Sequence, residues 1–267
     1  MKPDQILSEI QQLLSFGSAF LLQNRGTAVV AQQKGDRDYA LTVDVELERQ
    51  YSEQLHKLHP EIPVLGEELS PDLACNGGLF WAIDPIDGTV NYANGLPEYG
   101  TSIALIENEK PIAAGIAFPS LGEVYLAAAG KGAFLNGKPI HISEKTALNQ
   151  MFLGFGDFAV TGNYEEKNVV RMGCLQSFAG TVMRVRMPGS AALQLAWLAA
   201  GRLDISITLS NNPWDVQAGV LLVREAGGEV YDSDGSDHSI LSQYTIASNS
   251  PIKETILHHL SKIRIPE

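Results

Sequence analysis

The most constraining feature of this chain is a short apolar segment that ends in two acidic residues. Residues Leu79–Ile83 are all apolar, and the sequence Asp84-Pro85-Ile86-Asp87-Gly88-Thr89 follows them directly. An apolar run of this length is typical of a buried strand. Proline cannot continue a hydrogen-bonded ladder, and Asp-Gly favours a turn. We therefore expect both aspartates to lie together where a buried strand ends.

Two carboxylates held so close repel each other unless a proton or a cation lies between them, and oxygen ligands suit a hard ion such as Mg²⁺. A structural turn is the alternative interpretation. Further acids occur in similar contexts: Glu67 and Glu68 follow the apolar Ile62–Leu65, and Asp215 opens a run with helical periodicity. Taken singly, the glutamates are typical of a solvated loop and Asp215 of a helix-capping acid. Their recurrence favours a metal site.

Composition restricts the kind of protein and its partners. The net charge of −12 over 267 residues argues against a nucleic-acid-binding surface. The chain has no N-terminal signal pattern, and its longest apolar stretch, Ala191–Ala200, is too short to span a bilayer. Cys75 and Cys174 are isolated, which fits a reducing compartment and leaves a disulfide open. We expect a cytoplasmic protein of one domain or two closely joined halves.

The first half, residues 1–143, has the pattern of two helices followed by an antiparallel sheet. Apolar spacing predicts helices over Ile6–Leu21 and Val43–Leu58, with Thr42 as the cap of the second. Asn136-Gly137 predicts a hairpin turn. The expected strands are Leu79–Ile83, Thr101–Ile106, Ile112–Phe118 and Val124–Ala128.

The second half, residues 144–267, alternates strands with helices, which favours parallel pairing. A last helix is expected to begin at Ser250-Pro251. The stretches Gln32–Asp38 and Gly154–Arg171 are expected to be loops. The predicted helices are Ser190–Ala200 and Asp215–Ala226, and the predicted strands are Leu203–Ile207, Glu229–Tyr231 and Tyr244–Ala247.

Together, Gly66-Glu67-Glu68, the Asp84–Thr89 segment and Trp214-Asp215 resemble the signature of the inositol monophosphatase family. This family of Mg²⁺-dependent, lithium-sensitive phosphatases includes fructose-1,6-bisphosphatases. Asp38–Asp44, Gly189–Leu193 and Glu225–Gly228 are similar to other segments of the family, in the same order. The resemblance implies an α/β (α+β) fold of the layered αβαβα sandwich type, with residues 1–267 as a single unit, the site between the halves and a homodimer.

The resemblance also implies the site residues. Two or three Mg²⁺ ions would be held by Glu67, Asp84, the carbonyl of Ile86, Asp87 and Asp215, with Asp84 shared between two of them. Glu67, Asp44 and Thr89 would be catalytic, Thr89 passing a proton between water and Asp44. Glu68 and the loop from Lys34 to Asp38 would assist. The substrate would be bound by Asp87, Gly88, Thr89, Gly189, Ser190, Ala191 and Thr208.

Thr208 is a departure from the family, because many members carry an acidic residue at this position that binds ring hydroxyls. The reaction expected is hydrolysis of a small phosphate monoester by water that Mg²⁺ activates, with inositol monophosphate or a related polyol or sugar phosphate as substrate. Alternatives within the same chemistry are histidinol phosphate, 3′-phosphoadenosine 5′-phosphate, NADP and fructose 1,6-bisphosphate. A different class of function would be a regulatory binding protein without catalysis. No membrane or nucleic-acid partner is expected.

Overall fold

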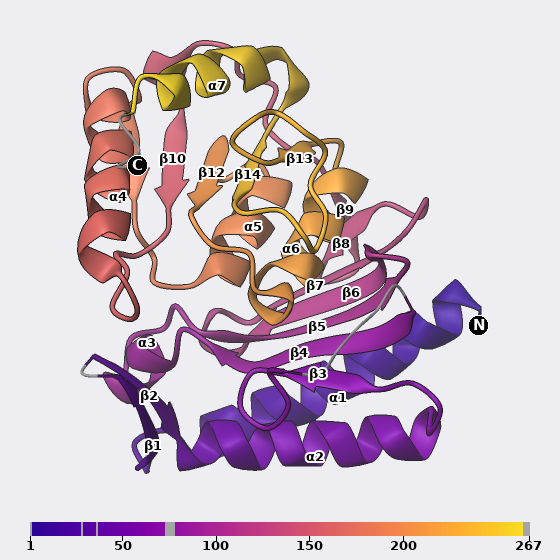
Figure 1. The fold of residues 1–267 in the computed structure, drawn as a ribbon. Helices are drawn as coiled ribbons and strands as arrows, with labels where there is room; N and C mark the ends of the chain where they lie inside the picture. Colours follow the sequence, from indigo (N-terminus) through magenta and orange to yellow (C-terminus); the bar gives the residue numbers. More distant parts are fainter. Residues whose placement is uncertain (1, 28, 36, 73–77, 264–267) are drawn as a thin grey trace.

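The computed structural model describes residues 2–27, 29–35, 37–72 and 78–263 as five alternating layers of helices and sheets (Figure 1). The outer helical layer consists of α1 (Pro3–Gln23) and α2 (Thr42–Leu58). They cover one face of a seven-stranded sheet with the strand order β3-β4-β5-β6-β7-β8-β9. All its pairs are antiparallel except β3 with β4, which is parallel. The strands are β3 (Val64–Gly66), β4 (Leu79–Asp87), β5 (Gly100–Glu107), β6 (Lys110–Phe118), β7 (Glu123–Ala128), β8 (Ala133–Leu135) and β9 (Lys138–Ile140).

The apolar run at the start of β4 is continuous because both faces of the strand are buried. Trp81 and Ile83 belong to the core formed with α1 and α2. Phe80 and Ala82 belong to a second core, formed with α5 (Ala191–Ala199) and α6 (Pro213–Glu225) on the opposite face of the sheet. Successive side chains of a strand point to opposite faces, so a strand between two helical layers needs apolar residues throughout.

Helices α5 and α6 form the middle layer, and a five-stranded sheet with the order β11-β10-β12-β14-β13 lies beyond them (Figure 1). Its strands are β10 (Phe152–Phe155), β11 (Arg184–Arg186), β12 (Ile205–Thr208), β13 (Glu229–Tyr231) and β14 (Thr245–Ser248). Helices α4 (Tyr164–Ala179) and α7 (Lys253–Ser261) form the last layer. The predicted αβαβα sandwich is therefore confirmed.

Shorter elements connect these layers. The hairpin β1 (Val30–Gly35) and β2 (Asp38–Leu41) precedes α2, and α3 (Thr89–Ala93) follows β4. Single 3₁₀ turns occupy η1 (Pro119–Leu121), η2 (Leu148–Gln150) and η3 (Ser250–Ile252). The predicted turn at Asn136-Gly137 is confirmed, because both residues have positive φ, 50° and 75°, as a type I′ turn requires.

Several local predictions are wrong. Thr42 is the first residue of α2 and not its cap; Leu41 occupies the cap position, and its N–H donates to Asp44. Of the first predicted loop, residues 32–35 belong to β1 and Asp38 begins β2; the second, Gly154–Arg171, contains the end of β10 and half of α4. The second sheet is only partly parallel, since β14 runs antiparallel to β12 and β13. The α4 pattern is weak because only three of its residues are buried.

The prediction that β4 ends at Ile83 also needs correction. The strand continues to Asp87 through an irregularity, in which Asp84 pairs with Ser102 and Asp87 pairs with Gly100. Pro85 and Ile86 lie opposite the single residue Thr101, so β4 has one extra residue here, and a proline lacking an N–H is tolerated in such a bulge. This bulge places both aspartates at the end of β4, where Asp87 contacts the start of α5.

Two further expectations concern the thiols and the membrane. Cys174 is buried, 1% exposed, in the core between α4 and the second sheet, whereas Cys75 lies outside the described residues. None of the helices in the described part of the chain combines the length and apolarity needed to cross a bilayer. The division at residues 143 and 144 stays a prediction.

Candidate active site

A cavity of about 470 Å³ opens beside the bulge of β4, and it contains most of the predicted site residues. Its walls come from the β1–β2 hairpin, the loop after β3, the end of β4, α3, the loop after β10 and the starts of α5 and α6. Among the described residues the lining consists of Arg37, Asp38, Glu67, Asp84, Ile86, Asp87, Gly88, Thr89, Val90, Asn91, Asp157, Phe158, Val160, Gly189 and Asp215.

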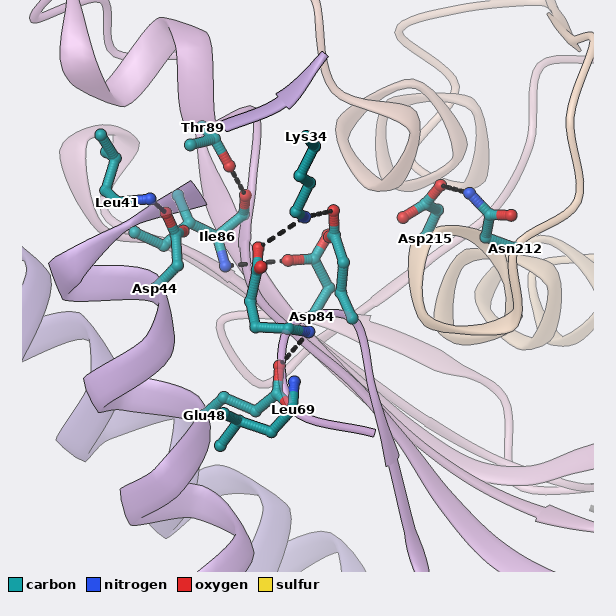
Figure 2. Close-up of polar contacts among 12 residues, drawn as sticks. Lys34, Leu41, Asp44, Glu48, Leu69, Asp84, Ile86, Thr89, Asn212 and Asp215 are labelled. Atoms are coloured by element: carbon teal, nitrogen blue, oxygen red, sulfur yellow. Dashed lines mark hydrogen bonds and ion pairs between the residues drawn. The ribbon is translucent and has the colours of Figure 1, made fainter. Parts of the chain in front are cut away.

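Three acids of this lining come close enough to share a metal ion. Carboxylate oxygens of Glu67, Asp84 and Asp215 lie within 4.8 Å of one another. Glu67 follows β3, Asp84 lies in the bulge of β4, and Asp215 is in the first turn of α6, where the Asn212 amide donates to it at 3.0 Å (Figure 2). Three segments far apart in the sequence thus bring together three of the predicted metal ligands.

The electrostatics of this cluster call for a cation. Burial raises the pKa of Asp84 well above its ordinary value, and the charges of Glu67, Asp87 and Asp215 raise it further. Burial and the same kind of repulsion raise the pKa of Asp215. The ammonium of Lys34 ion-pairs with Glu67 at 2.8 Å and with Glu68 at 2.9 Å (Figure 2). Burial alone would lower the pKa of Lys34, but the two glutamates raise it overall.

Asp87 faces the beginning of α5 instead of the cluster. Its carboxylate accepts hydrogen bonds from the Ser190 hydroxyl at 2.7 Å and from the Ala192 N–H at 2.5 Å. Burial raises the pKa of Asp87 to about 6 despite these bonds, which lower it. Of the predicted substrate contacts Gly189, Ser190 and Ala191, only Gly189 lines the cavity. Ser190 caps α5 and orients Asp87.

The predicted pair of Thr89 and Asp44 is not formed in this structure. The Thr89 hydroxyl donates to the Ile86 carbonyl at 2.9 Å, whereas Asp44 accepts from the Leu41 N–H at 2.7 Å (Figure 2). Asp44 is buried and does not line the cavity, and burial raises its pKa to about 8. Thr89 does line the cavity, next to Gly88, whose φ of 94° suits glycine.

Thr208 lies outside the cavity. It is the last residue of β12, is 5% exposed, and its hydroxyl has no hydrogen-bond partner among the residues described. The structure therefore does not bring Thr208 together with the other predicted substrate contacts.

Sequence reasoning missed several residues that shape the site. Glu48 is completely buried on α2 and accepts hydrogen bonds from the N–H groups of Glu68 and Leu69, so it holds the loop that carries Glu67. The Asn91 amide donates to the carbonyls of Glu98 and Pro188, both at 2.7 Å, and so joins the first half to the segment before α5. An acid within a helix is typical of a solvated face, and no sequence signal distinguished Glu48.

The donor set decides which metals fit. The described side chains that form the cluster, Glu67, Asp84 and Asp215, are all carboxylates. Such oxygen ligands favour Mg²⁺, Ca²⁺ or Mn²⁺. The raised pKa values of Asp84 and Asp215 show that these carboxylates repel one another, and a bound divalent cation would remove that repulsion. The residues present therefore fit a hard divalent ion.

Comparisons with known proteins agree with this geometry. Residues 3–264 match the model of the inositol monophosphatase family. The fructose-1,6-bisphosphatase/inositol-1-monophosphatase of Thermotoga maritima is 31% identical over 261 residues, 97% of each chain. The Nus factor SuhB of Xylella fastidiosa is 39% identical over 205 residues, 77% of this chain and 73% of that protein.

Solved structures show the same similarity in three dimensions. An IMPase from Thermotoga maritima superposes with a TM-score of 0.87 at 31% identity, covering 97% of this chain and 98% of that one. The inositol monophosphatase from Anabaena gives 0.85 at 30% identity, covering 98% and 97%. The chain therefore belongs to the inositol monophosphatase family and is a phosphatase.

Proposed function

We propose that this chain hydrolyses the phosphate monoester of a small polyol or sugar, with inositol monophosphate as the first candidate, and that it uses Mg²⁺. The observation that carries the proposal is the convergence of Glu67, Asp84 and Asp215 within 4.8 Å in a cavity large enough for such a substrate. The names of the relatives from Thermotoga, Rhizobium meliloti and tomato, which include inositol monophosphatases, support this substrate class.

Glu67, Asp84 and Asp215 would hold Mg²⁺, with Asp87 and the Ile86 carbonyl completing the ligands. When bound, Mg²⁺ supplies neutralisation of the phosphoryl charge, activation of a water molecule and stabilisation of the leaving oxygen. Two hydrogen bonds fix the main chain of Ile86. Its N–H donates to Asp84 at 2.9 Å, and its carbonyl oxygen accepts from the Thr89 hydroxyl. A main-chain ligand held in this way needs no particular side chain.

The remaining residues bind and orient. The N–H groups of Gly88 and Thr89, at the start of α3, would donate to phosphoryl oxygens. Thr89 would orient the attacking water through its hydroxyl, which already lies at the cavity wall. Asp87, fixed by Ser190 and Ala192, would contact the substrate or a second metal with little loss of side-chain entropy, because its rotamer is already set.

The alternatives differ in substrate or in class. Histidinol phosphate, 3′-phosphoadenosine 5′-phosphate, NADP and fructose 1,6-bisphosphate would need the same metal residues. A regulatory role without catalysis is the alternative of another class, and two relatives carry the name Nus factor. Glu67, Asp84 and Asp215, three of the acids proposed to hold the metal, lie within 4.8 Å of one another, which favours the enzyme.

A panel of phosphate monoesters assayed for released phosphate, with Mg²⁺ and with excess chelator, tests the proposal. We expect turnover with Mg²⁺, none with chelator, and recovery when Mg²⁺ is restored. Asp84→Asn, checked for folding by circular dichroism, is the negative control. Full turnover in chelator, or no hydrolysis of any ester with Mg²⁺, would contradict the proposed function.

A further inference from the structure

The cavity contains one acid that neither the metal cluster nor the motifs explain. Asp157 follows β10 and lines the cavity on the side of the second sheet, together with Phe158 and Val160. No described residue donates a hydrogen bond to its carboxylate or pairs with its charge, and desolvation by neighbouring protein atoms raises its pKa although its side chain stays exposed. An acid without a partner in a binding cavity has free acceptor oxygens.

The loop that carries Asp157 is held firmly although it has no regular secondary structure. Arg171 of α4 donates to the Asp157 carbonyl at 2.9 Å and to the Leu209 carbonyl at 3.1 Å. Asn168 of the same helix accepts from the Ala159 N–H at 2.7 Å and donates to the Ala159 carbonyl at 3.0 Å. These bonds fix the backbone on both sides of Phe158, so the position of Asp157 is set before a substrate binds.

Arg171 forms its hydrogen bonds with main-chain carbonyls. It is 8% exposed, and its guanidinium donates to three main-chain carbonyls, those of Asp157, Leu209 and Lys167. Because these acceptors are neutral, the arginine positions the loop without neutralising the Asp157 carboxylate. Burying the charged guanidinium of Arg171 costs free energy, and its hydrogen bonds to these carbonyls offset part of that cost while they hold the Asp157 loop in place.

Asp157 lies at the same edge of the second sheet as Thr208, the position at which the expected acid is absent. β10 and β12 are adjacent and parallel, with Phe155 paired to Ile207, so their carboxyl ends lie at the same edge of the sheet. Thr208 ends one strand and is buried, whereas Asp157 lies two residues beyond the end of the other and faces the cavity. The cavity thus receives an acid from the loop after β10 and no side chain from Thr208.

We propose that Asp157 is the residue that selects the substrate: its carboxylate accepts hydrogen bonds from two hydroxyls of the leaving group, so that the chain prefers a single phosphate on a neutral polyhydroxylated skeleton. This inference rests on the proposed phosphatase function. Two carboxylate oxygens match a pair of neighbouring hydroxyls. The loss of such bonds to a charged acceptor lowers turnover by about ten- to a hundredfold.

The charge of the cavity supports the same substrate class. Six described lining residues are carboxylic acids, and Arg37, whose guanidinium lies 5.2 Å from the ring centre of Tyr164, is the one basic residue among them. Even two divalent ions would leave this lining net negative. A second phosphate beside Asp157 would be repelled, so bisphosphates and NADP are disfavoured.

The test compares a substrate that has hydroxyls near the ester, inositol 1-phosphate, with one that has none, propyl phosphate. kcat and KM are measured with saturating Mg²⁺ for the unmutated protein, Asp157→Ala and Asp157→Asn. Glu165→Gln is the matched control, since it removes a nearby exposed charge outside this cavity. We expect Asp157→Ala to lower kcat/KM about ten- to a hundredfold for inositol 1-phosphate, with propyl phosphate unchanged within about twofold. Asp157→Asn, which keeps one acceptor oxygen, is expected to lie between.

The outcomes separate the two proposals. An equal change for both substrates, or no change for inositol 1-phosphate, would overturn the role of Asp157 while leaving the phosphatase function intact. Failure of the unmutated protein to hydrolyse either ester would contradict the phosphatase function itself, before any variant is compared. A selective loss in Glu165→Gln equal to that in Asp157→Ala would show a long-range charge effect and would also overturn the role.

Discussion

Gly66→Ala is the sharpest test of how α2 positions the metal loop. A Cβ at this position would lie 2.0 Å from Oε1, 2.4 Å from Cδ and 3.0 Å from Oε2 of Glu48. Ordinary contacts are more than 1 Å longer than the first of these, so the Glu48 carboxylate must retreat by about that much. Its bonds from the N–H groups of Glu68 and Leu69 are 2.7 and 2.8 Å long and would both break.

The expected cost follows from those two bonds. A donor left without a partner costs about 1–3 kcal/mol when buried. Both N–H groups are only partly buried, and water would satisfy part of the loss, so we expect the free energy of unfolding to fall by about 2–4 kcal/mol. Because the same loop carries Glu67, the concentration of Mg²⁺ that gives half-maximal activity should rise as well, by about ten- to a hundredfold.

Urea unfolding of the metal-free protein and Mg²⁺ titration of the activity measure the two effects. Gly180→Ala is the control, because a Cβ there meets no atom within 4 Å and the φ of −91° is open to alanine. In the background Glu48→Ala the clash is absent, so Gly66→Ala should then cost little and the two changes should be strongly non-additive. A loss below about 0.5 kcal/mol for Gly66→Ala, or additive losses, would refute the argument.

Three further predictions concern the acids and the metal. Asp84→Asn should lose more than about a hundredfold of kcat at saturating Mg²⁺, and Glu68→Gln, which acts through Lys34, about ten- to a hundredfold; near-normal turnover of Asp84→Asn would contradict the site. Li⁺ at millimolar concentration should inhibit, as in the family, and an unchanged rate would mean that the metal site differs. Burial raises the folded pKa of Asp87 to about 6 and of Asp44 to about 8 from the ordinary 3.8, so the unfolded chain releases these protons first. The contribution of these two groups to the free energy of unfolding, measured in chelator, should therefore be fully present below pH 4 and be lost as the pH rises toward 8; a urea-unfolding profile that is flat between pH 4 and 8, or one that Asp44→Asn leaves unchanged, would contradict this.

The sequence predicted the helices and strands that bury an apolar face. It did not predict those with few buried residues. α1 and the strands β4 to β7 have regular apolar patterns because they contribute to the cores on the two faces of the seven-stranded sheet. Only Arg171, Cys174 and Phe178 of α4 are buried. The apolar pattern of this helix is therefore weak, and its first half was predicted to be a loop. The β1–β2 hairpin has no buried face before Ala40, and alternation could not reveal it. Parallel pairing was predicted from alternation of elements, but β14 follows β13 without a helix between them and pairs antiparallel.

The site divides in the same way. The acids were recognised because each follows an apolar segment or opens a helix, which is a local signal. The residues that position these acids and the cavity loops, Glu48, Asn91 and Arg171, were not recognised, because their hydrogen bonds join residues 20, 97 and 38 positions apart in the sequence. Asn91 and Arg171 bond to main-chain carbonyls of other segments. Main-chain carbonyls are the same in every residue, so no pattern of side chains announces them.

Hydrogen bonding distinguishes Glu48 and Asp44 from Asp84. Glu48 accepts from two main-chain N–H groups, and Asp44 lies at the first turn of α2 and accepts from Leu41, so each has a role in folding that is complete without a ligand. Asp84 is 2% exposed, lies near four other carboxylates, those of Glu67, Asp87, Asp215 and Asp44, and accepts only the Ile86 N–H among the described donors. An apolar residue of similar size at that position would remove the repulsion and stabilise the metal-free fold. Stability of the metal-free fold therefore does not explain an acid at this position, whereas a cation bound by Asp84 together with Glu67 and Asp215 does.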